Sequence, residues 1–306
     1  MIADSGLEPG VRPPGLDLTA VDSTGILSSS VGLVGPGRAG RAFARSWKNA
    51  GGRLAWVLAR DPEKGAGIGA DTVVSPEAGP LPPCDIAVLA VPDDAVTPVA
   101  ESLAGRLTCR YAFHLAGALG SDAIRSLRHS GSAVGSLHPV RPFAGADTDD
   151  WRGAFVAVEG DEPAAEAGER LATAVGARPH RLTATDRSLY HASATLAAGG
   201  TAAVVSIGVR GWVAAGIPED IARETLAALA SRAAAAVAER PFAAAFTGAV
   251  ARRDAGTVRS HVAALGSHAE ALAVYRALAE EILRRTPGSG REEEIRQILH
   301  SEKLGP

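Results

Sequence analysis

The sequence lacks most of the features that mark disulfide-rich, zinc-binding and nucleic-acid-binding proteins. It has only two cysteines, Cys84 and Cys109, which lie far apart and outside any CxxC or Cys/His ligand spacing. Neither a disulfide framework nor a metal site is therefore expected, and both thiols are expected to be buried. The net charge is −3 and no basic tract exceeds a dipeptide, so we expect neither nucleic acid nor an anionic membrane as a partner.

The first 30 residues contain no apolar run long enough for a signal peptide or a membrane span. They are rich in Pro, Gly, Ser and Asp, a composition typical of a flexible tail. We therefore expect a flexible N-terminal tail at residues 1–30 and a cytoplasmic protein. The remaining length is sufficient for two domains with separate cores.

Short apolar runs alternate with helical patterns up to about residue 182, which is typical of a parallel sheet covered by helices. After residue 183 the strand pattern disappears and alanine-rich helical patterns continue. The predicted fold class is an α/β Rossmann-type parallel sheet domain at 31–182, followed by an all-α C-terminal domain at 183–306. The apolar runs span 31–35, 54–59, 72–74, 85–91, 111–116, 132–137 and 154–159.

The all-α region begins with a long, almost uniformly apolar helical pattern from Asp186 to about Ala215, for which Thr185 is the expected N-cap. A helix that is apolar on every side must be buried on every side. A domain of this size needs a second subunit to cover such a helix, so we predict a homodimer through the C-terminal helical domain. Further helices are predicted over about 218–238, 254–285 and 291–300.

The hexapeptide Gly35-Pro36-Gly37-Arg38-Ala39-Gly40 fits the pattern G-x-G-x-x-G and lies between an apolar strand pattern and an amphipathic helical pattern. The first glycine permits a tight turn, the second lets the backbone approach a pyrophosphate, and the third lets helix and strand pack closely. The helix N-terminus then supplies amides to the phosphates. We predict that this loop binds a dinucleotide.

The end of another predicted strand, Ala90-Val91-Pro92, should complete the cofactor site, because open α/β sheets bind ligands at the carboxyl edge. Asp93 or Asp94, which follow it, are expected to cap the next helix. About 20 residues after the glycine loop, where NAD-binding proteins have an acidic residue, the sequence has Arg60. An arginine there can pair with a 2′-phosphate, which favours NADP(H) over NAD, although Asp61 follows immediately.

Several motifs together resemble a known family. They are VGLVGPGRAGRAFA, DIAVLAVPDDAV, HLAGALGSDAI, GSLHPVRPF, DRSLYHASATLA and FTGAVARRDAGTVRSHVAAL. The chain resembles bacterial proteins that join a Rossmann-like domain to a C-terminal domain of unknown function 2520. These proteins are relatives of the 6-phosphogluconate dehydrogenase-like group, which includes pyrroline-5-carboxylate reductase and ketopantoate reductase. The resemblance implies an NADP-dependent reductase of a small C=O or C=N compound.

The sequence departs from this family at two polar positions. The fifth strand ends in His114-Leu115-Ala116-Gly117 where relatives have hydroxyl residues before the glycine, and Gly199 stands where relatives have an asparagine on the long helix. In related dehydrogenases such an asparagine helps to hold the substrate. The departures suggest an altered substrate or a loss of catalysis.

A reductase takes its hydride from the cofactor and needs a group that supplies a proton. Three histidines are candidates: His114 at a strand end, His138 before a proline, and His191 on the long helix. His138 is the first choice, because a strand end in this topology opens toward the cofactor. A structural role, as a hydrogen-bonding or capping residue, remains the alternative for each.

Candidate substrate-binding residues are Tyr190, Thr247, Arg252 and Arg141, of which the arginines could hold a carboxylate. The sequence contains no Gly-x-Ser-x-Gly, Walker or His-Glu-x-x-His motif, so hydrolase, kinase and metallopeptidase activities have no support. We predict an NADP(H)-dependent oxidoreductase that reduces a 2-oxo acid or a cyclic imine in the interdomain cleft. The alternatives are an NADP-binding sensor or scaffold without turnover, and an enzyme without net redox chemistry.

Overall fold

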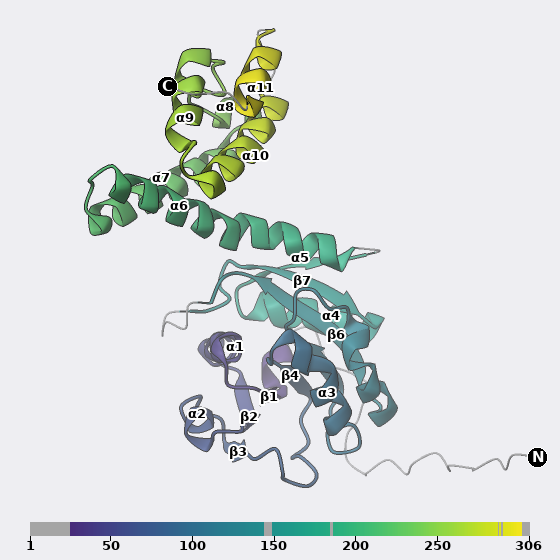
Figure 1. Cartoon of the computed structure of the whole chain (residues 1–306). Coiled ribbons are helices and arrows are strands. Elements are labelled where there is room, and N and C mark those ends of the chain that lie inside the picture. The colour runs from purple at the N-terminus through teal and green to yellow at the C-terminus, as the bar shows by residue number, and fades with distance from the viewer. Residues whose placement is uncertain (1–24, 144–148, 184–185, 287, 289, 302–306) are drawn as a thin grey trace, which may run out of the picture. The chain divides into compact units, whose positions relative to one another are not determined.

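The computed structural model describes residues 25–143, 149–183, 186–286, 288 and 290–301. The chain forms two compact units, one ending at Ala194 and the other starting at Thr195. The first contains the sheet and the second is helical (Figure 1). The fold class is therefore the predicted one, an α/β Rossmann-type domain followed by an all-α domain.

The described part of the predicted N-terminal tail belongs to the fold. A short 3-10 helix, η1 (Ile26–Ser28), precedes the first strand, and the Ile26 side chain is buried in the hydrophobic core. Residues 1–24 lie outside the described residues. The buried Ile26 side chain thus ties the turn before β1 to the sheet.

The sheet has eight strands in the order β3-β2-β1-β4-β5-β6-β7-β8. The pairs among β1 to β6 are parallel, whereas β7 pairs antiparallel with β6. Seven strands coincide with the seven apolar runs of the sequence. The strands are β1 (Ser30–Val34), β2 (Arg53–Leu58), β3 (Thr72–Val74), β4 (Ile86–Leu89), β5 (Tyr111–His114), β6 (Ala133–Val140), β7 (Phe155–Gly160) and β8 (Arg178–Arg181).

Three features of the sheet differ from the prediction, and the first is that β7 is antiparallel to β6 in a sheet expected to be parallel. The edge strand β8 has the polar sequence Arg-Pro-His-Arg and is half exposed, so it has no apolar pattern. Strand β6 continues through His138 and Pro139 to Val140 instead of ending before them. Beyond Ser136, β6 pairs only with β7, so the missing amide of Pro139 interrupts no pairing with β5.

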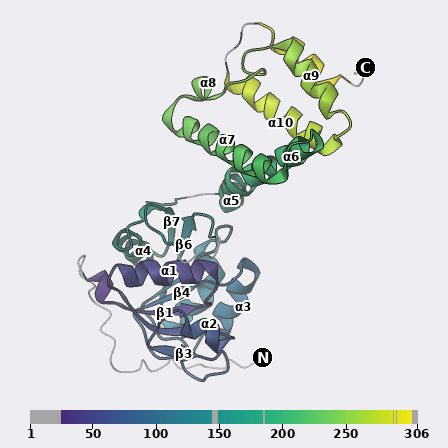
Figure 2. The ribbon, with the colours of Figure 1, turned by 90° about the vertical axis from the view of Figure 1, so that its left-hand side faces the viewer.

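Helices cover both faces of the sheet (Figure 2). One hydrophobic cluster packs α1 and α4 against it and includes Phe43, Trp47 and Trp151. The other packs α3 and the 3-10 helix η2 and includes Trp56 and Leu127. The helices between the strands are α1 (Arg38–Asn49), α2 (Pro62–Ala66), α3 (Asp93–Leu103), η2 (Ser121–Ser130) and α4 (Glu162–Ala174).

The expected cap of α3 is wrong in detail. Pro92 occupies the N-cap position, and Asp93 and Asp94 lie in the first helical turn, with no side-chain capping hydrogen bond. Their carboxylates still stabilise the helix there, because negative charge interacts favourably with a helix N-terminus. With Asp93 as the N-cap, the helix would begin at Asp94; it begins instead at Asp93.

A long helix runs from Arg187 to Ala214, as the apolar pattern predicted. It comprises α5 (Arg187–Thr195), a π-helical turn η3 (Leu196–Gly200) and α6 (Thr201–Ala214). Thr185 lies outside the described residues, and Asp186 accepts a hydrogen bond from the Leu189 amide at 3.0 Å. None of these described residues is buried, and the helix is long and apolar enough to cross a membrane.

The second unit is built from α6 and five further helices. A small core lies between α9, α10 and α11 and includes Val258, Leu283 and Ile295. Helix α7 packs against α6, and Ala222 is its one buried residue in the described chain. The further helices are α7 (Glu219–Glu239), α8 (Phe242–Ala245), α9 (Ala255–Leu265), α10 (Ala269–Arg285) and α11 (Glu292–His300).

Candidate active site

The glycine loop connects β1 to α1, and two of its glycines are required by the fold itself. Gly35 has a positive φ of 94°, and a Cβ there would lie 2.6 Å from the Ala90 carbonyl oxygen. A Cβ on Gly40 would overlap the carbonyl oxygen of Gly35. These two positions hold the turn, the end of β4 and the helix in close contact.

Gly37 is different, because no contact among the described residues requires a glycine there. A Cβ would meet its nearest atom, the Ala90 carbonyl oxygen, at 3.9 Å, an ordinary contact distance. Gly37 is also the N-cap of α1, which has neither a side-chain cap nor an acidic residue in its first turn. Amides of a first helical turn lack partners within the helix and attract anions. The loop therefore fits a phosphate group that approaches the backbone at Gly37.

A cavity of about 930 Å³ opens beside this loop and is large enough for much of a dinucleotide. The loop, the ends of β2 and β4, and helices α2 and α3 line it. The predicted cofactor residues Arg38, Ala39 and Gly40 form the first turn of α1. The other predicted cofactor residues all line the cavity: Gly35, Pro36, Gly37, Arg60, Ala90, Val91 and Pro92.

The charges at one end of this cavity bear on the choice of nucleotide. Asp61 caps α2, where it accepts a hydrogen bond from the Glu63 amide at 3.1 Å and lies 3.4 Å from the Lys64 ammonium. The hydrogen bond from the Lys64 amide, with the neighbouring charge, lowers the pKa of Asp61. Among the described residues, no hydrogen bond or ion pair engages the exposed Arg60 side chain. The acidic side chain is thus occupied with the helix while the arginine faces the cavity.

The sequence did not single out Arg41, which braces the glycine loop. Its guanidinium donates to the Pro36 carbonyl at 3.1 Å and to the Lys64 carbonyl at 2.9 Å. The side chain therefore ties the loop to α2. No sequence pattern distinguishes this arginine from its neighbours, because the role depends on where α2 lies in space.

The three predicted histidines and Tyr190 come together in the first unit. His114 is the last residue of β5, His138 lies in β6, and Tyr190 and His191 follow each other in α5. Nδ1 of His138 lies 2.8 Å from the Tyr190 hydroxyl, and its ring centre lies 5.6 Å from that of His191. Nε2 of His114 lies 3.0 Å from the Gly120 carbonyl oxygen.

Gly117 is the residue around which two of these rings meet. A Cβ at this position would lie 2.7 Å from Nε2 of His138 and would overlap Nδ1 of His191. Two imidazoles from different elements therefore share the space above one glycine. The sequence placed Gly117 just after a predicted strand, but it did not predict that His138 and His191 would pack against it.

Burial fixes the protonation of the cluster. Burial, together with the smaller electrostatic effects of His191, Arg187 and His114, lowers the pKa of His138 to about 4. Burial also lowers the pKa of His114, although the hydrogen bond to Gly120 opposes the effect. The pKa of Tyr190 is raised by burial. At neutral pH, His138 and His114 are uncharged and the Tyr190 phenol keeps its proton.

An ion pair that the sequence did not reveal borders the cluster. The Arg187 side chain is 10% exposed and donates from Nε to the Glu159 carboxylate at 2.6 Å. Glu159 also accepts a hydrogen bond from the Ser121 amide at 3.2 Å. The Arg187 guanidinium carbon lies 6.0 Å from the centre of the Tyr190 ring. This pair connects β7, η2 and α5 and places a cation beside the phenol.

The cavity and the histidine cluster lie at the same edge of the sheet. Ala90 follows β4 and lines the cavity, while His114 ends the adjacent strand β5, with Leu89 as its register partner. Adjacent strands are about 5 Å apart, so Ala90 and His114 lie at the ends of neighbouring strands. In the described part of the chain, no group of three or more His, Cys, Asp or Glu residues could hold a metal ion.

The remaining predicted substrate residues lie elsewhere. Arg141 is exposed and bonds to the Asp150 carboxylate at 3.4 Å and to the Arg152 carbonyl at 3.2 Å. Thr247 and Arg252 belong to the second unit and are exposed. Within the first unit, only Tyr190 of the four candidates contacts the histidine cluster.

A neighbouring arginine has a structural role in the second unit. Arg253 is 3% exposed and has a positive φ of 54°. Its guanidinium donates to the Thr286 hydroxyl at 2.8 Å and lies 3.2 Å from the Glu292 carboxylate. Arg253 thus joins the loop before α9 to the start of α11.

Solved structures with the same fold include several enzymes and proteins linked to nicotinamide cofactors. A Bacteroides fragilis protein described as a candidate NADP oxidoreductase matches with a TM-score of 0.68 and 17% identity, over 85% of this chain and 100% of its own. A pyrroline carboxylate reductase from Plasmodium falciparum, solved with NADP bound, matches with a TM-score of 0.56 and 11% identity, over 88% and 98%. An imine reductase from Streptomyces aurantiacus matches with a TM-score of 0.56 and 17% identity, over 83% and 93%.

Sequence comparison adds a family match to part of the chain. No curated protein matches the chain. The family model described as Domain of unknown function (DUF2520) matches residues 154–282, which include the last two strands and the helices up to α10. The chain therefore combines a Rossmann-type fold with a region that matches the DUF2520 model.

Proposed function

We propose that this protein is an NADP(H)-dependent oxidoreductase that reduces a small C=O or C=N substrate, either a 2-oxo acid or a cyclic imine. One observation supports this proposal above all. The glycine loop and its cavity lie at the end of β4, and a cluster of three histidines and a tyrosine begins at the end of the neighbouring strand β5. Open α/β sheets bind ligands at this edge. The similarity to imine and pyrroline carboxylate reductases favours the substrate class at the level of fold.

The preference for NADP(H) follows from Arg60 and Asp61. A carboxylate at this place would accept hydrogen bonds from ribose hydroxyls in an NAD-binding site. Here Asp61 caps α2 and pairs with Lys64, so Arg60 is the side chain at this end of the cavity that is left to meet a ligand. A guanidinium binds a 2′-phosphate through charge-assisted hydrogen bonds.

When bound, the nicotinamide supplies the hydride. The amides at the start of α1 bind phosphate, and the end of β4 borders the cavity. The cluster of His114, His138, Tyr190 and His191 holds the proton that the reduced substrate needs. It also excludes water from part of the site, because His114 is fully buried and His138 mostly so.

A second candidate function is an NADP-binding sensor or scaffold without redox turnover. Ala116, at a position where a hydroxyl was expected from related proteins, is buried in an apolar cluster. Gly199 lies in the π-helical turn η3 and offers no side-chain amide. This function retains the nucleotide site but predicts no turnover of any carbonyl or imine.

The first experiment is a fluorescence titration with NADPH and NADH of the wild type and Arg60→Ala. We expect NADPH to bind more tightly than NADH, and the substitution to weaken NADPH selectively by about tenfold or more. Arg53→Ala is the matched control, since Arg53 lies at the opposite end of the same strand, where it pairs with Asp71 on the surface. If neither nucleotide binds at sub-millimolar concentration, the oxidoreductase proposal is wrong.

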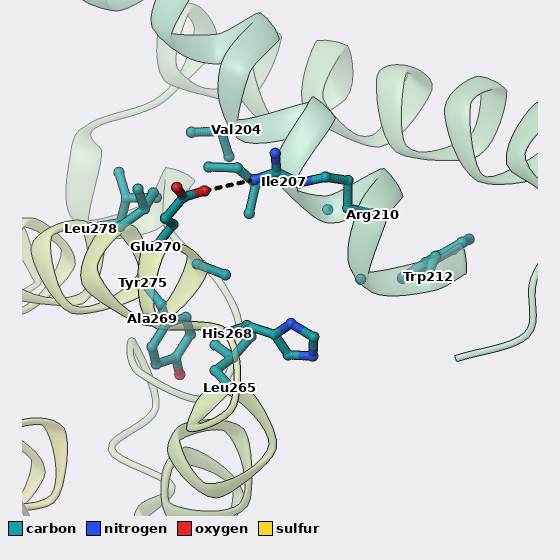
Figure 3. A pocket seen from close by; sticks show the side chains of 14 residues that line it. Val204, Ile207, Arg210, Trp212, Leu265, His268, Ala269, Glu270, Tyr275 and Leu278 are labelled. Carbon is teal, nitrogen blue, oxygen red and sulfur yellow. Dashed lines mark hydrogen bonds and ion pairs between the residues drawn. The ribbon is translucent and has the colours of Figure 1, made fainter. Parts of the chain in front are cut away.

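We also propose that the second unit forms a homodimer through its apolar groove. A cavity of about 610 Å³ lies between α6 and α10 and is lined largely by apolar side chains, with the Arg210–Glu270 ion pair of 3.4 Å crossing it (Figure 3). Leu278 on its wall is 46% exposed and Val204 is 40% exposed. A surface this apolar is typical of an interface.

A second copy of the chain presents an apolar helix and groove of the same kind. A helix of 28 residues is about 42 Å long and 10 Å wide, so one face covers about 400 Å². In a two-fold dimer each copy contributes both a helix and a groove, about 800 Å² per partner, which is the area of a stable interface. A lipid bilayer fits less well, because α7 lies along α6 and carries the exposed Glu219–Arg223 ion pair.

Light scattering of the purified full chain tests the dimer. We expect twice the monomer mass for the wild type and a monomer for Leu278→Glu. Leu229→Glu is the control, because Leu229 is 61% exposed on α7 and does not line the groove. A monomeric wild type would overturn the proposal, and so would binding of the chain to phospholipid vesicles that Leu278→Glu abolishes.

A further inference from the structure

We propose that Tyr190 gives the proton to the reduced substrate, and that His138 is the positioning residue that holds the phenol and replaces its proton. This inference rests on the proposed reductase function. It stands on the 2.8 Å contact between the Tyr190 hydroxyl and Nδ1 of His138, and on the packing that fixes both rings.

The surroundings of His138 explain why it does not give the proton directly. Its Nδ1 faces the Tyr190 hydroxyl, and its Nε2 lies against Gly117 beside His191, so neither ring nitrogen points into the cavity beside the glycine loop. Its depressed pKa leaves it uncharged at neutral pH. An uncharged imidazole is a far weaker acid than an imidazolium, and a phenol is then the stronger acid of the pair.

Tyr190 has the properties that the donor requires. It is only partly buried, whereas His114 is fully buried. The groups that face Tyr190 are His138 and Arg187, and the guanidinium of Arg187 lies 6.0 Å from the ring centre. A cation at this distance stabilises the phenolate that forms when the proton leaves. Burial keeps the phenol protonated until then.

The proton transfer balances without a further reactant. The O–H bond of Tyr190 breaks, and its proton moves to the oxygen or nitrogen whose electron pair is released when NADPH delivers its hydride. The N–H at Nδ1 of His138 passes its proton to the phenolate oxygen. Nε2 of the same ring takes up one proton from solvent at the same time, which leaves His138 neutral with its hydrogen on Nε2. Loss of that proton to solvent and uptake of one at Nδ1 restore the starting tautomer before the next turnover. The net consumption is one NADPH and one proton for each substrate molecule.

The direction of this relay makes a prediction that needs no substrate. For His138 to replace the phenol proton, its neutral ring must carry hydrogen on Nδ1 and donate to Tyr190. Nitrogen-15 NMR of the histidine-labelled full chain distinguishes the two tautomers, with His138→Gln used to assign the resonance. We expect the Nδ1–H tautomer at pH 7 and a shift of that resonance in Tyr190→Phe. An Nε2–H tautomer, or a charged ring at pH 7, would overturn the proposal.

Kinetics test the same proposal in the reaction. With NADPH and 1-pyrroline or 2-oxobutyrate as probes, Tyr190→Phe should lower kcat by about 100-fold or more, with NADPH affinity unchanged. The pH profile of the residual activity should also lose its alkaline limb. Tyr111→Phe is the matched control, since Tyr111 is buried on β5 away from the cluster.

The outcomes separate the two proposals. A wild type that turns over either probe, together with an equally active Tyr190→Phe, refutes the role of Tyr190 and leaves the reductase function standing. A wild type that binds NADPH but reduces neither probe contradicts the reductase function itself. Rescue by His138→Asn but not by His138→Leu would agree with a positioning role, because an amide can still hydrogen-bond the phenol.

Discussion

Substitution of Gly117 by alanine is the sharpest single perturbation of the candidate site. The added Cβ would lie 2.7 Å from Nε2 of His138, so this ring must retreat by about 0.7 Å to reach the 3.4 Å at which Cβ contacts become ordinary. The His191 ring must move at least as far, because the same Cβ overlaps it. Both rings would therefore leave their present positions relative to Tyr190.

The expected effect on catalysis is large and local. A misplacement of about 1 Å in catalytic groups costs about 100-fold in rate, whereas insertion of a methyl group into a packed region costs about 1–3 kcal/mol in stability. We therefore expect kcat of Gly117→Ala to fall by about 100-fold while NADPH affinity remains that of the wild type. The glycine loop and its cavity do not include Gly117.

The assay is the oxidation of NADPH by the most active substrate of the panel, with nucleotide binding and thermal unfolding measured on the same samples. Gly79→Ala is the control, because a Cβ there meets nothing within 4 Å. If Gly117→Ala retains wild-type turnover, the paired imidazoles above this glycine have no part in the reaction. If it loses NADPH binding as well, the cluster supports the fold and not the chemistry.

Three further predictions concern stability. The pKa of His138 is about 4 in the folded protein, below the 6.5 of a free histidine. The unfolded state therefore binds the proton more readily, and protonation favours unfolding. The free energy of unfolding should fall by about 2 kcal/mol between pH 7 and pH 5. His138→Gln should flatten this pH dependence in urea unfolding, and an unchanged slope would contradict the assignment. Gly199→Ala should raise the free energy of unfolding by up to about 1 kcal/mol, because alanine favours a helix more than glycine does. The added Cβ has room, since it meets only Thr195 Cγ2 at 4.0 Å. A loss of stability would show that the π-helical turn needs this glycine. Arg253→Ala should lower the free energy of unfolding by about 3 kcal/mol, because buried hydrogen bonds are lost. Arg252→Ala is the control at the exposed neighbouring position and should change the free energy of unfolding by less than about 0.5 kcal/mol. Equal effects of the two substitutions would refute the role of Arg253.

The sheet domain was predictable because its strands are continuous apolar runs between glycine and proline. Strand β8 was not, since Arg178 and its neighbours are polar and lie at the sheet edge. That His114 and His138 lie toward the same edge of the sheet could be anticipated from the rule that parallel strands end at one edge. That Tyr190 and His191 would join them depended on the path of the chain before α5, which no local pattern encodes.

The residues that sequence reasoning missed act through contacts between distant elements. Arg41 links the glycine loop to α2, and Arg187 pairs with Glu159 across 28 residues of chain. Gly117 was visible only as part of a motif. Its role depends on rings that approach it from β6 and α5. Such roles follow from packing, to which periodicity and spacing give no access.

The tryptophans divide between the two units in a way that makes each unit separately observable. Trp47, Trp56 and Trp151 are fully buried on the two faces of the sheet, while Trp212 lies in α6 and is partly exposed. Buried indoles emit at shorter wavelengths than hydrated ones. Replacing Trp212 by phenylalanine would therefore leave a fluorescence spectrum that reports only on the sheet domain, and the difference from the wild type would follow the helical domain alone.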